Sequence, residues 1–351
     1  MHDTAAAGIC VRELEPAAAP RWDAFVADCP EATFFHKAGW KRVIEEGLGH
    51  RTYFLYAERP DGRIDGILPL AFIRSRLFGR SLTSTAFCVY GGPVASTAAA
   101  ERALTSKAIE IGNRLDVGYI EYRSRKPIQT DGWKQKPPLY ATFRKALDPD
   151  PERNFLAIPR KQRAMVRKGI SAGLVSQVDT EIDRLHAVYA ESVRNLGTPV
   201  FPRRYFAMLM REFAADAQVL TILHQGRAIG SVMSFFFRDE VLPYYGGGTA
   251  AARDAAANDF MYWEVMRRAV ERGYRLFDFG RSKIGTGAFR FKTHWGFDPE
   301  PLDYQYYLVR SREMPDVNPL NPKYQRLIAA WKRLPLPVAN FVGPWIARDL
   351  G

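Results

Sequence analysis

The sequence predicts a mixed α/β (α+β) protein of two tandem domains, each with a mixed, largely antiparallel sheet flanked by helices. The chain has 351 residues, more than one ordinary hydrophobic core accommodates. Apolar residues make up 47% of it and charged residues 25%, which is typical of a folded globular protein. The third observation is an internal repeat, in which the second half of the chain restates the pattern of the first.

The repeat begins in each half with two strands joined by a short turn. The turn glycines Gly62 and Gly226 lie 164 residues apart, and so do the strand glycines Gly66 and Gly230. The turns read Asp-Gly and Gln-Gly, and tight hairpins favour such residues because they tolerate positive φ. Each half therefore starts with an antiparallel hairpin.

Further along, the spacing of the repeat changes to 155 residues. Tyr90-Gly91-Gly92 matches Tyr245-Gly246-Gly247, and after a helix Gly118-Tyr119 matches Gly273-Tyr274. We assign the net difference of nine residues to an extra piece at Arg74–Arg80, between the second and third strands. Each half then reads strand, turn, strand, strand, helix, strand, which predicts a mixed sheet.

Helical periodicity is clearest in the second repeat. An apolar stripe predicts a helix with Asn258 or Asp259 at its start and Gly273 at its end. The stripe consists of Met261, Val265, Met266, Ala269 and Val270. Residues 182–196 and 205–213 show the same periodicity and predict two further helices.

Prolines mark the expected domain borders. Pro149 and Pro151 enclose the acidic residue Asp150, so we expect a first domain over residues 1–150 and a second over 151–313. Residues 314–351 form a proline-rich C-terminal tail.

The tail itself contains one expected helical piece, around Tyr324–Arg333. Pro335, Pro337 and Pro344 argue against a continuous helix over 334–347. The tail either wraps back over the domains or touches an anionic membrane surface with its tryptophans, phenylalanine and cations.

The charge predicts anionic partners. A net charge of +12 and a pI near 9.6 fit phosphates, nucleic acid, acidic glycan or an anionic membrane, although solubility alone is an alternative reason for the excess. Three cysteines without a CxxC pair form neither a disulfide framework nor a zinc site. We expect no secretory signal and no membrane-spanning stretch, hence a cytoplasmic protein, in one interpretation peripheral to the inner membrane.

Several motifs together resemble a known family. The motifs are Phe34-Phe35-His36, Asp278-Phe279-Gly280, Phe291-Lys292, Trp295-Gly296-Phe297 and the tail Trp331–Pro337. They make the chain similar to the FemAB-like aminoacyl transferases of the GNAT superfamily. More narrowly, it resembles the FemAB-like proteins found beside exosortase and exopolysaccharide genes.

This resemblance implies tandem GNAT-like domains, the second carrying the donor and catalytic side and the first a degenerate, acceptor-side copy. It also implies transfer of an acyl or aminoacyl group to an amine of a cell-envelope precursor. The co-substrate is then acyl-CoA or aminoacyl-tRNA, with no tightly bound cofactor. The chain departs from standard GNAT enzymes because residues 248–259 do not match their pyrophosphate loop, which puts acyl-CoA in doubt.

Acyl transfer needs a donor to the developing oxyanion and a base for the amine proton. Lys292, in a segment rich in aromatic residues, is the candidate oxyanion donor, against a solvated turn lysine as the alternative. Asp278 is a candidate base, against a structural salt bridge with Arg281 or Arg290. Tyr245 completes the candidate catalytic set.

The remaining candidates bind substrate or donor. We assign three groups of side chains to an anionic acceptor. They are three cations at helical spacing, a histidine–lysine pair that in Fem-like proteins lines the acceptor cleft, and tyrosines and arginines near the two Tyr-Gly-Gly motifs and the segment 278–297. These are His36, Lys37, Tyr90, Arg160, Arg163, Arg167, Tyr244, Arg281 and Arg290. The donor is assigned to glycines that allow close backbone approach and to a helix start, namely Gly246, Gly247, Gly248 and Asn258.

For several of these residues a structural interpretation stays open. His36 is an ordinary buried, hydrogen-bonded histidine in one interpretation. The basic run, residues 159–168, is a solvated helix face in another. Pro93 removes an amide in the first-half copy of the glycine run. The histidines show no metal-ligand spacing, so we expect no metal.

Three functions follow from these expectations. The leading one is an N-acyltransferase acting on an amine of an envelope or exopolysaccharide precursor. The second is an aminoacyl-tRNA-dependent ligase of peptidoglycan precursor, which predicts salt-sensitive binding of tRNA. The third is a non-catalytic double-GNAT module that binds glycan or acts as a scaffold.

Overall fold

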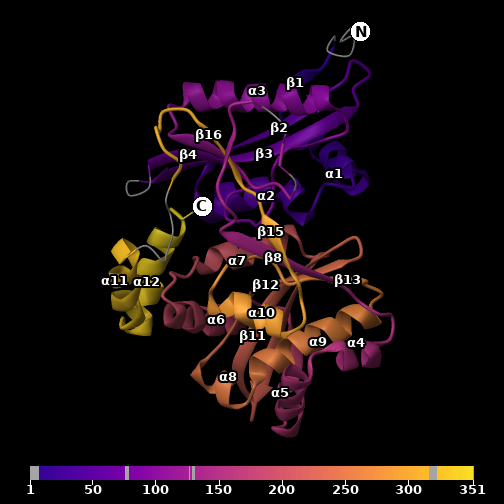
Figure 1. Ribbon diagram of the computed structural model, residues 1–351, viewed down its shortest axis with the longest axis vertical. Helices are drawn as coiled ribbons and strands as arrows, with labels where there is room; N and C mark the ends of the chain where they lie inside the picture. The colour runs from indigo at the N-terminus through magenta and orange to yellow at the C-terminus, as the bar shows by residue number, and fades with distance from the viewer. Residues whose placement is uncertain (1–7, 76–78, 126, 129–130, 316–321, 351) are drawn as a thin grey trace. The chain divides into compact units, whose positions relative to one another are not determined.

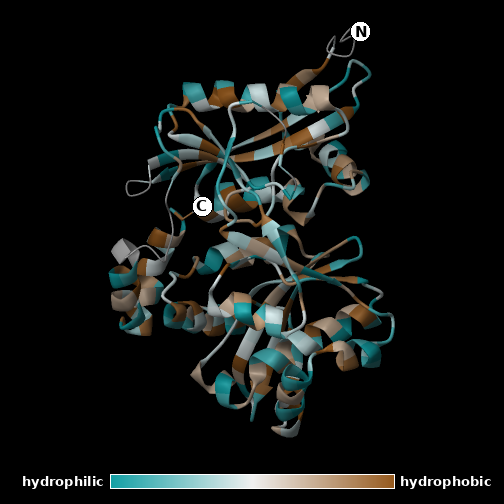
Figure 2. Cartoon of the chain, in the orientation of Figure 1, coloured by the Kyte–Doolittle hydropathy of each residue, from teal (hydrophilic) through white to brown (hydrophobic). Residues whose placement is uncertain are grey.

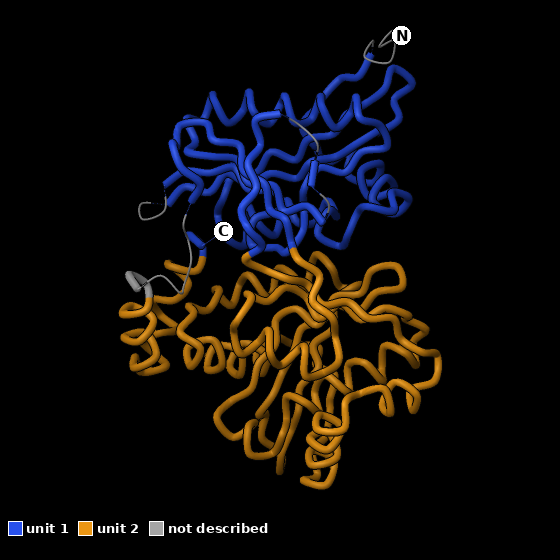
Figure 3. The backbone as a smooth tube through the Cα atoms, in the orientation of Figure 1, with its two compact units in different colours: residues 1–138, 302–316, 348–351 blue, residues 139–301, 317–347 orange. Residues whose placement is uncertain are grey.

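The computed structural model describes residues 8–75, 79–125, 127–128, 131–315 and 322–350. The chain forms two compact units (Figure 3). Unit 1 comprises Met1–Pro138, Leu302–Asp316 and Arg348–Gly351, and unit 2 comprises Leu139–Pro301 and Val317–Ala347. Each unit is built around its own mixed sheet, which confirms the predicted fold class (Figure 1).

The sheet of unit 1 has the strand order β1-β2-β3-β4-β6-β16-β7, with β5 also paired to β3. Its strands are β1 (Cys10–Glu13), β2 (Arg51–Glu58), β3 (Ile64–Ser75), β4 (Gly79–Ser84), β5 (Val94–Ala95), β6 (Tyr119–Tyr122), β7 (Lys134–Gln135) and β16 (Gln305–Leu308). The β4–β6 pair is parallel and its neighbours are antiparallel. The helices are α1 (Ala19–Asp28), α2 (Gly39–Arg42) and α3 (Ala98–Arg114).

The sheet of unit 2 has the order β14-β8-β13-β12-β11-β10-β9, with β15 on β8. Its strands are β8 (Tyr140–Ala146), β9 (Val175–Asp179), β10 (Ala217–His224), β11 (Arg227–Phe237), β12 (Glu240–Gly248), β13 (Leu276–Asp278), β14 (Ser282–Lys283) and β15 (Pro299–Leu302). Its helices are α4 (Pro151–Ala157), α5 (Arg160–Ser171), α6 (Asp183–Leu196), α7 (Arg203–Glu212), α8 (Ala250–Asp254), α9 (Ala257–Glu271), α10 (Gly287–His294), α11 (Pro322–Lys332) and α12 (Leu336–Ala347).

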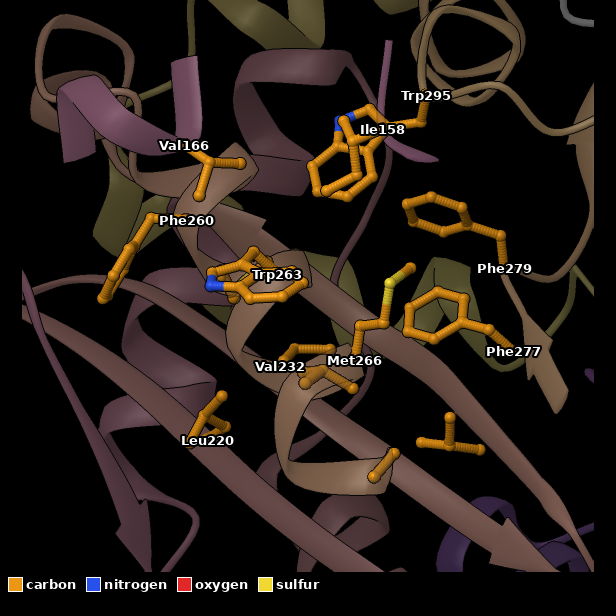
Figure 4. Close-up of a cluster of buried hydrophobic side chains, with 14 of the residues drawn as sticks. Ile158, Val166, Leu220, Val232, Phe260, Trp263, Met266, Phe277, Phe279 and Trp295 are labelled. Atoms are coloured by element: carbon orange, nitrogen blue, oxygen red, sulfur yellow. The ribbon is translucent and has the colours of Figure 1, made fainter. Parts of the chain in front are cut away.

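Hydrophobic residues follow the strands of both sheets (Figure 2). In unit 2, α9 packs on one sheet face and α6 with α7 on the other. The cluster under α9 includes Trp263, Met266, Phe277, Phe279 and Trp295 (Figure 4). Burial of these large side chains supplies the main stabilising term of the unit, on the order of 2 kcal/mol for each one.

The predicted hairpins and the predicted end of the helix at Gly273 are confirmed. Gln225 and Gly226 have φ values of 50° and 76°, as a tight turn between β10 and β11 requires. Gly273 has φ 92° and follows the end of α9, where the amide of Tyr274 donates to the carbonyl of Ala269. The start of α9 differs from expectation, because Ala256 precedes it without a side-chain cap and Asn258 and Asp259 lie in its first turn.

The glycine match between the halves needs correction. Gly66 of β3 faces Ala95, and its repeat partner Gly230 of β11 faces Gly248. The ladders therefore equate Ala95 with Gly248, and Tyr90-Gly91-Gly92 precedes β5 instead of lying in the ladder. The extra residues of the first half are accordingly divided between the β3–β4 hairpin and the segment between β4 and β5. Residues 76–78 of the expected extra piece lie outside the described residues.

Each sheet contains a strand from the other half of the sequence. β8 follows the first repeat in the chain, yet it pairs with β13 and β14 of unit 2. Conversely, β16 follows the second repeat and pairs with β6 of unit 1. The expected border at residue 150 thus differs from the unit border at Pro138, because Phe143 and Ala141 of β8 are buried in the unit 2 core.

The expectation that residues 334–347 contain no continuous helix is wrong. α12 runs from Leu336 to Ala347 with Pro344 inside it. Pro337 lies in the first turn, where the missing amide costs nothing. The predicted helix before it is present as α11, although the side chains of residues 322–324 lie outside the described part.

Candidate functional site

The strand ends of unit 2 diverge where the candidate catalytic residues lie. The parallel ladder between β12 and β13 joins Glu240 to Leu276 and Val241 to Phe277, and ends before residues 242–248. On its other side β12 pairs with β11, where Met233 is opposite Tyr245 and Ser234 is opposite Pro243. Tyr244 lies between these two pairs and forms a β-bulge. A bulge re-aims the side chains that follow it, here Tyr245 and the glycine run.

Lys292 lies on α10 with its side chain turned into unit 2. Its Nζ donates to the carbonyls of Gly280 at 2.9 Å and Arg281 at 3.1 Å. The Nζ also lies 5.4 Å from the ring centroid of Phe143 and 5.6 Å from that of Phe279. These contacts exclude the alternative of a solvated turn lysine.

The surroundings of Lys292 change its ionisation. Burial lowers the pKa of Lys292 to about 7, the charge of Asp278 opposes this, and the charge of Arg281 adds to it. The two carbonyls use two of the three N–H donors of an ammonium group. A third N–H donor is what stabilisation of an oxyanion needs, and a pKa near neutrality is what a general acid–base group needs.

Asp278 ends β13 and is almost fully buried. Its Oδ1 accepts hydrogen bonds from the Gly280 amide at 2.7 Å and from Thr142 at 3.4 Å, and its Oδ2 lies 3.5 Å from Arg144 Nε. Arg144 also pairs with Glu240. These contacts support the structural alternative and add Arg144, on the exchanged strand β8, as an ion-pair partner of Asp278.

The two arginines named as possible partners of Asp278 make other contacts. The guanidinium carbon of Arg281 lies 4.7 Å from the ring centroid of Tyr140. Arg290 is exposed on α10 and donates to the Gly285 carbonyl. Arg281 is close enough to lower the pKa of Lys292, so the structure brings Lys292, Asp278 and Arg281 together at the end of β13.

Tyr245 belongs to an aromatic cluster on the face covered by α6 and α7. Its hydroxyl lies 2.8 Å from that of Tyr205, and both side chains are buried. Tyr189, Phe206 and the bulge residue Tyr244 pack around it edge to face. Lys292 instead contacts rings of the cluster under α9, so the candidate catalytic residues are distributed over two faces of the sheet.

The glycines of β12 make room for neighbouring helices. A Cβ on Gly247 would lie 2.3 Å from Ser192 Oγ on α6, and one on Gly248 would lie 2.6 Å from the Ala252 Cβ on α8. A Cβ on Gly246 would lie 2.9 Å from Val232 Cγ2. Close packing against α6, α8 and strand β11 therefore accounts for the small size of these three residues.

The start of α8 is capped by a carboxylate. The amide of Ala250, the first residue of α8, donates to the carboxylate of Glu191 at 2.9 Å. That carboxylate occupies the position where a phosphate would accept, and its charge would repel one. The Oδ1 of Asn258 is buried without a hydrogen-bond partner, and Asp259 accepts from Trp295 Nε1 at 2.9 Å.

The basic run forms α5, as predicted. Arg163 donates to the carbonyl of Leu156, and the guanidinium carbon of Arg167 lies 5.3 Å from the ring centroid of Phe155. Both arginines thus turn toward α4, while Arg160 is exposed beside Lys161. The face retains its positive charge, with part of it held by local contacts.

In unit 1, His36 and Tyr90 line a hollow of about 260 Å³. His36 Nδ1 lies 3.0 Å from the Thr33 amide, which donates to it, and Nε2 lies 2.9 Å from the Gly92 carbonyl. The neutral Nε2–H tautomer satisfies both bonds. Other lining residues include Glu31, Glu101, Arg123, Ser124 and Arg125.

The hollow is polar and of mixed charge. Arg123 pairs with Glu121 at 2.9 Å and donates to the Cys88 carbonyl at 3.0 Å. The buried Ser124 Oγ has no hydrogen-bond partner, and burial raises the pKa of Glu101. Lys37 follows His36 and is partly exposed. Cation, hydroxyl and carboxyl groups are therefore available to a polar ligand here.

The described residues offer neither a metal site nor a membrane-spanning helix. No group of three or more His, Cys, Asp or Glu side chains there is arranged to hold a metal ion. No helix in the described part of the chain is long and apolar enough to cross a membrane.

Two tandem sheets, each with a repeated hairpin, strand, helix and strand, define a double α/β transferase fold. Residues 157–293 match the family model of the acetyltransferase (GNAT) domain. The chain therefore carries a GNAT acyltransferase domain over these residues, which include Asp278 and Lys292. This confirms the expected superfamily and enzyme class. GNAT domains as a class use acyl-CoA as co-substrate.

Solved structures extend the similarity to the whole chain. FemX has a TM-score of 0.67 at 15% identity, covering 91% of this chain and 100% of its own. The C-terminal domain of a putative lysylphosphatidylglycerol synthetase from Agrobacterium fabrum has a TM-score of 0.55 at 15% identity, with 84% and 92% covered. A tandem GNAT protein from the clavulanic acid biosynthesis pathway has a TM-score of 0.52 at 15% identity, with 85% and 98% covered.

These likenesses confirm the expected FemAB-like, tandem GNAT fold. Among curated protein sequences, none matches this chain.

Sequence reasoning missed the partners of the candidate residues. Arg144 and Glu191 were not singled out, although both decide what their neighbours can do. Arg144 lies on β8, where Ala141 to Phe143 are buried in succession and Arg144 and Lys145 are partly exposed, so the strand shows no alternation. Nothing local in the sequence indicates that this strand pairs with β13, 130 residues away.

Proposed function

We propose that this protein is an N-acyltransferase that moves an acyl or aminoacyl group onto an amine of a cell-envelope or exopolysaccharide precursor. The observation that carries the proposal is the position of Lys292 inside the matched GNAT domain. Its Nζ is fixed by two backbone carbonyls and keeps one donor for a ligand. A fixed cation at a strand end can stabilise the oxyanion that forms when an amine attacks a carbonyl.

The roles of the other residues follow from their contacts. Asp278 holds the end of β13 through Arg144 and the Gly280 amide, and its charge favours the ammonium form of Lys292. The positive charge of Arg281 lowers the pKa of Lys292, against the effect of Asp278, and Arg281 orients an anionic acceptor. Tyr245, Tyr244 and the glycines Gly246 to Gly248 shape the divergent part of β12, and Asn258 offers an unpaired oxygen to the donor.

Unit 1 supplies acceptor binding in this proposal. The hollow lined by His36 and Tyr90 contains cations and a carboxyl group, which suits a polar, phosphate- or amine-bearing precursor. The exposed cations of α5, with Arg160 foremost, add a surface for phosphates of the precursor or of tRNA.

The donor is an acyl-CoA bound away from the start of α8, or an aminoacyl-tRNA. The carboxylate of Glu191 at that helix start favours the second option. The aminoacyl-tRNA-dependent ligase of peptidoglycan precursor remains the second candidate on this observation.

A donor-binding comparison tests the proposed function. Thermal unfolding is followed with acetyl-CoA, with longer acyl-CoAs and with aminoacyl-tRNA, because a ligand that binds only the folded state raises the unfolding temperature. We expect one donor class to protect the protein, and protection by tRNA to weaken steeply with salt. Uncharged tRNA and free CoA serve as controls. Protection by none of the donors supports the non-catalytic module and contradicts the enzyme.

A further inference from the structure

The last helix, α12, presents an apolar face to solvent. Val338, Phe341 and Trp345 have exposed fractions of 44%, 77% and 68%. Spacings of three and four residues place them on one side of the helix. Large exposed aromatic side chains at such spacing are unusual on a soluble surface and mark an interaction site.

The opposite side of α12 is firmly packed. Ala339, Gly343 and Ala347 are buried at spacings of four residues. A Cβ on Gly343 would lie 3.1 Å from the backbone nitrogen of Val200, so the helix backbone closely approaches the segment that follows α6. The small residues therefore anchor α12 to unit 2 and leave the aromatic side outward.

Two neighbouring elements also carry exposed apolar side chains. Leu196 at the end of α6 is 70% exposed, and Leu327 of α11 is 65% exposed. α11 packs at the same end of α6, because a Cβ on Gly197 would lie 2.4 Å from Ile328 Cγ2. We call these five side chains the α12 patch: Leu196, Leu327, Val338, Phe341 and Trp345.

The sequence around the patch is strongly basic. Residues 322–348 contain five cations and no acid. The cations are Lys323, Arg326, Lys332, Arg333 and Arg348. Arg326, Lys332 and Arg333 are exposed, and α12 itself carries no charge over its twelve residues. An uncharged helix with outward aromatics, preceded by cations, matches the interface of an anionic bilayer, where aromatic rings enter the headgroup region and cations attract the lipid charge.

We propose that the α12 patch docks this protein on the surface of an anionic lipid bilayer, with Phe341 and Trp345 inserted at headgroup depth. The helix lies in the plane of the interface, held by apolar burial and by the cations of residues 322–348. This docking does not depend on the acyl-transfer chemistry.

Vesicle flotation tests the docking. The full chain is mixed with vesicles of phosphatidylcholine alone or with about one third phosphatidylglycerol, a fraction that gives a strongly negative surface. We expect flotation with the anionic vesicles only, and its loss at about 1 M salt, which shortens the screening length to about 3 Å. The Phe341→Ser/Trp345→Ser variant should bind at least about tenfold more weakly, since both inserted rings are lost.

The matched control removes exposed apolar side chains elsewhere in unit 2. Leu156 and Ile170 are 55% and 52% exposed, on α4 and on the equally basic α5. Leu156→Ser/Ile170→Ser should leave flotation unchanged. Because all four side chains are exposed, both variants should unfold at the wild-type temperature, which thermal unfolding checks.

Three outcomes would overturn the proposal. The first is the absence of flotation with anionic vesicles. The second is flotation that the Phe341→Ser/Trp345→Ser variant leaves unchanged. Flotation that the Leu156→Ser/Ile170→Ser variant removes has the same meaning, because it assigns lipid binding to α4 and α5. The third is lipid-free self-association in sedimentation velocity that Phe341→Ser/Trp345→Ser abolishes, which makes the patch an interface between copies of this chain.

Discussion

Replacing Lys292 by methionine is expected to lower the rate of acyl transfer by about 10²–10³-fold. This is the loss that follows removal of one oxyanion donor, about 2.7–4 kcal/mol of barrier. Methionine keeps the length and apolar stem that pack against Phe143 and Phe279, so the core contacts remain. The measurement is the initial rate with the donor that protects the folded protein, together with thermal unfolding of the variant.

Lys145 provides a matched control for this substitution. It also lies in unit 2, its Nζ lies 3.4 Å from the Gly296 carbonyl and 5.6 Å from the Phe297 ring centroid, and burial lowers its pKa. Lys145→Met should therefore retain activity. A Lys292→Met protein that is folded and as active as the wild type would remove Lys292 from the mechanism.

Removing β8 is expected to unfold unit 2. A fragment of residues 151–347 begins at the border that the prolines suggested and lacks β8. A fragment of residues 139–347 contains it. β8 fills the position between β13 and β14 in the sheet order, and Phe143 on it is fully buried. The shorter fragment should show no cooperative unfolding transition by circular dichroism, whereas the longer one should show a sharp transition.

A point substitution in the full-length chain tests the role of β8 without truncation. Phe143→Ala should destabilise the protein by about 3–5 kcal/mol, the usual cost of removing a buried phenylalanine. Two fragments that unfold with equal cooperativity, together with a Phe143→Ala protein of wild-type stability, would show that β8 is dispensable.

The sequence predicted those elements of the fold that are determined by residues close together in the chain. The hairpins at Asp61-Gly62 and Gln225-Gly226, the apolar stripe of α9 and its end at Gly273 all depend on residues within a few positions of one another. The repeat then extended these elements to a second copy. Strand exchange has no such local signal, because β8 and β16 find their partners across more than 100 residues of sequence.

The candidate site divides in the same way. A lysine between aromatic residues predicted a buried or cleft position for Lys292, and the fold places its ammonium group among carbonyls and rings. The glycines of β12 predicted close approach, and the fold brings Ser192 and Ala252 against two of them. Glycine patterns reveal that something is near the backbone, and only the fold reveals what it is.

The helix α12 is an element with a local signal that the sequence analysis did not use. Proline positions were weighed as helix breakers throughout, although Pro337 lies in a first turn and the small residues Ala339, Gly343 and Ala347 form a packing stripe. That stripe has the spacing of a helix face and was readable from the sequence.

The pH dependence of the rate tests the central claim, that Lys292 acts as a cation on the developing oxyanion, most directly. With a weakly basic acceptor such as methoxyamine, which stays neutral over the range, the wild-type rate should fall as pH rises through about 7, since the ammonium form is lost there. Lys292→Arg keeps its charge, so its rate should lack this fall. A wild-type rate that rises through pH 7, with an inactive arginine variant, would contradict the claim and make the neutral amine a base.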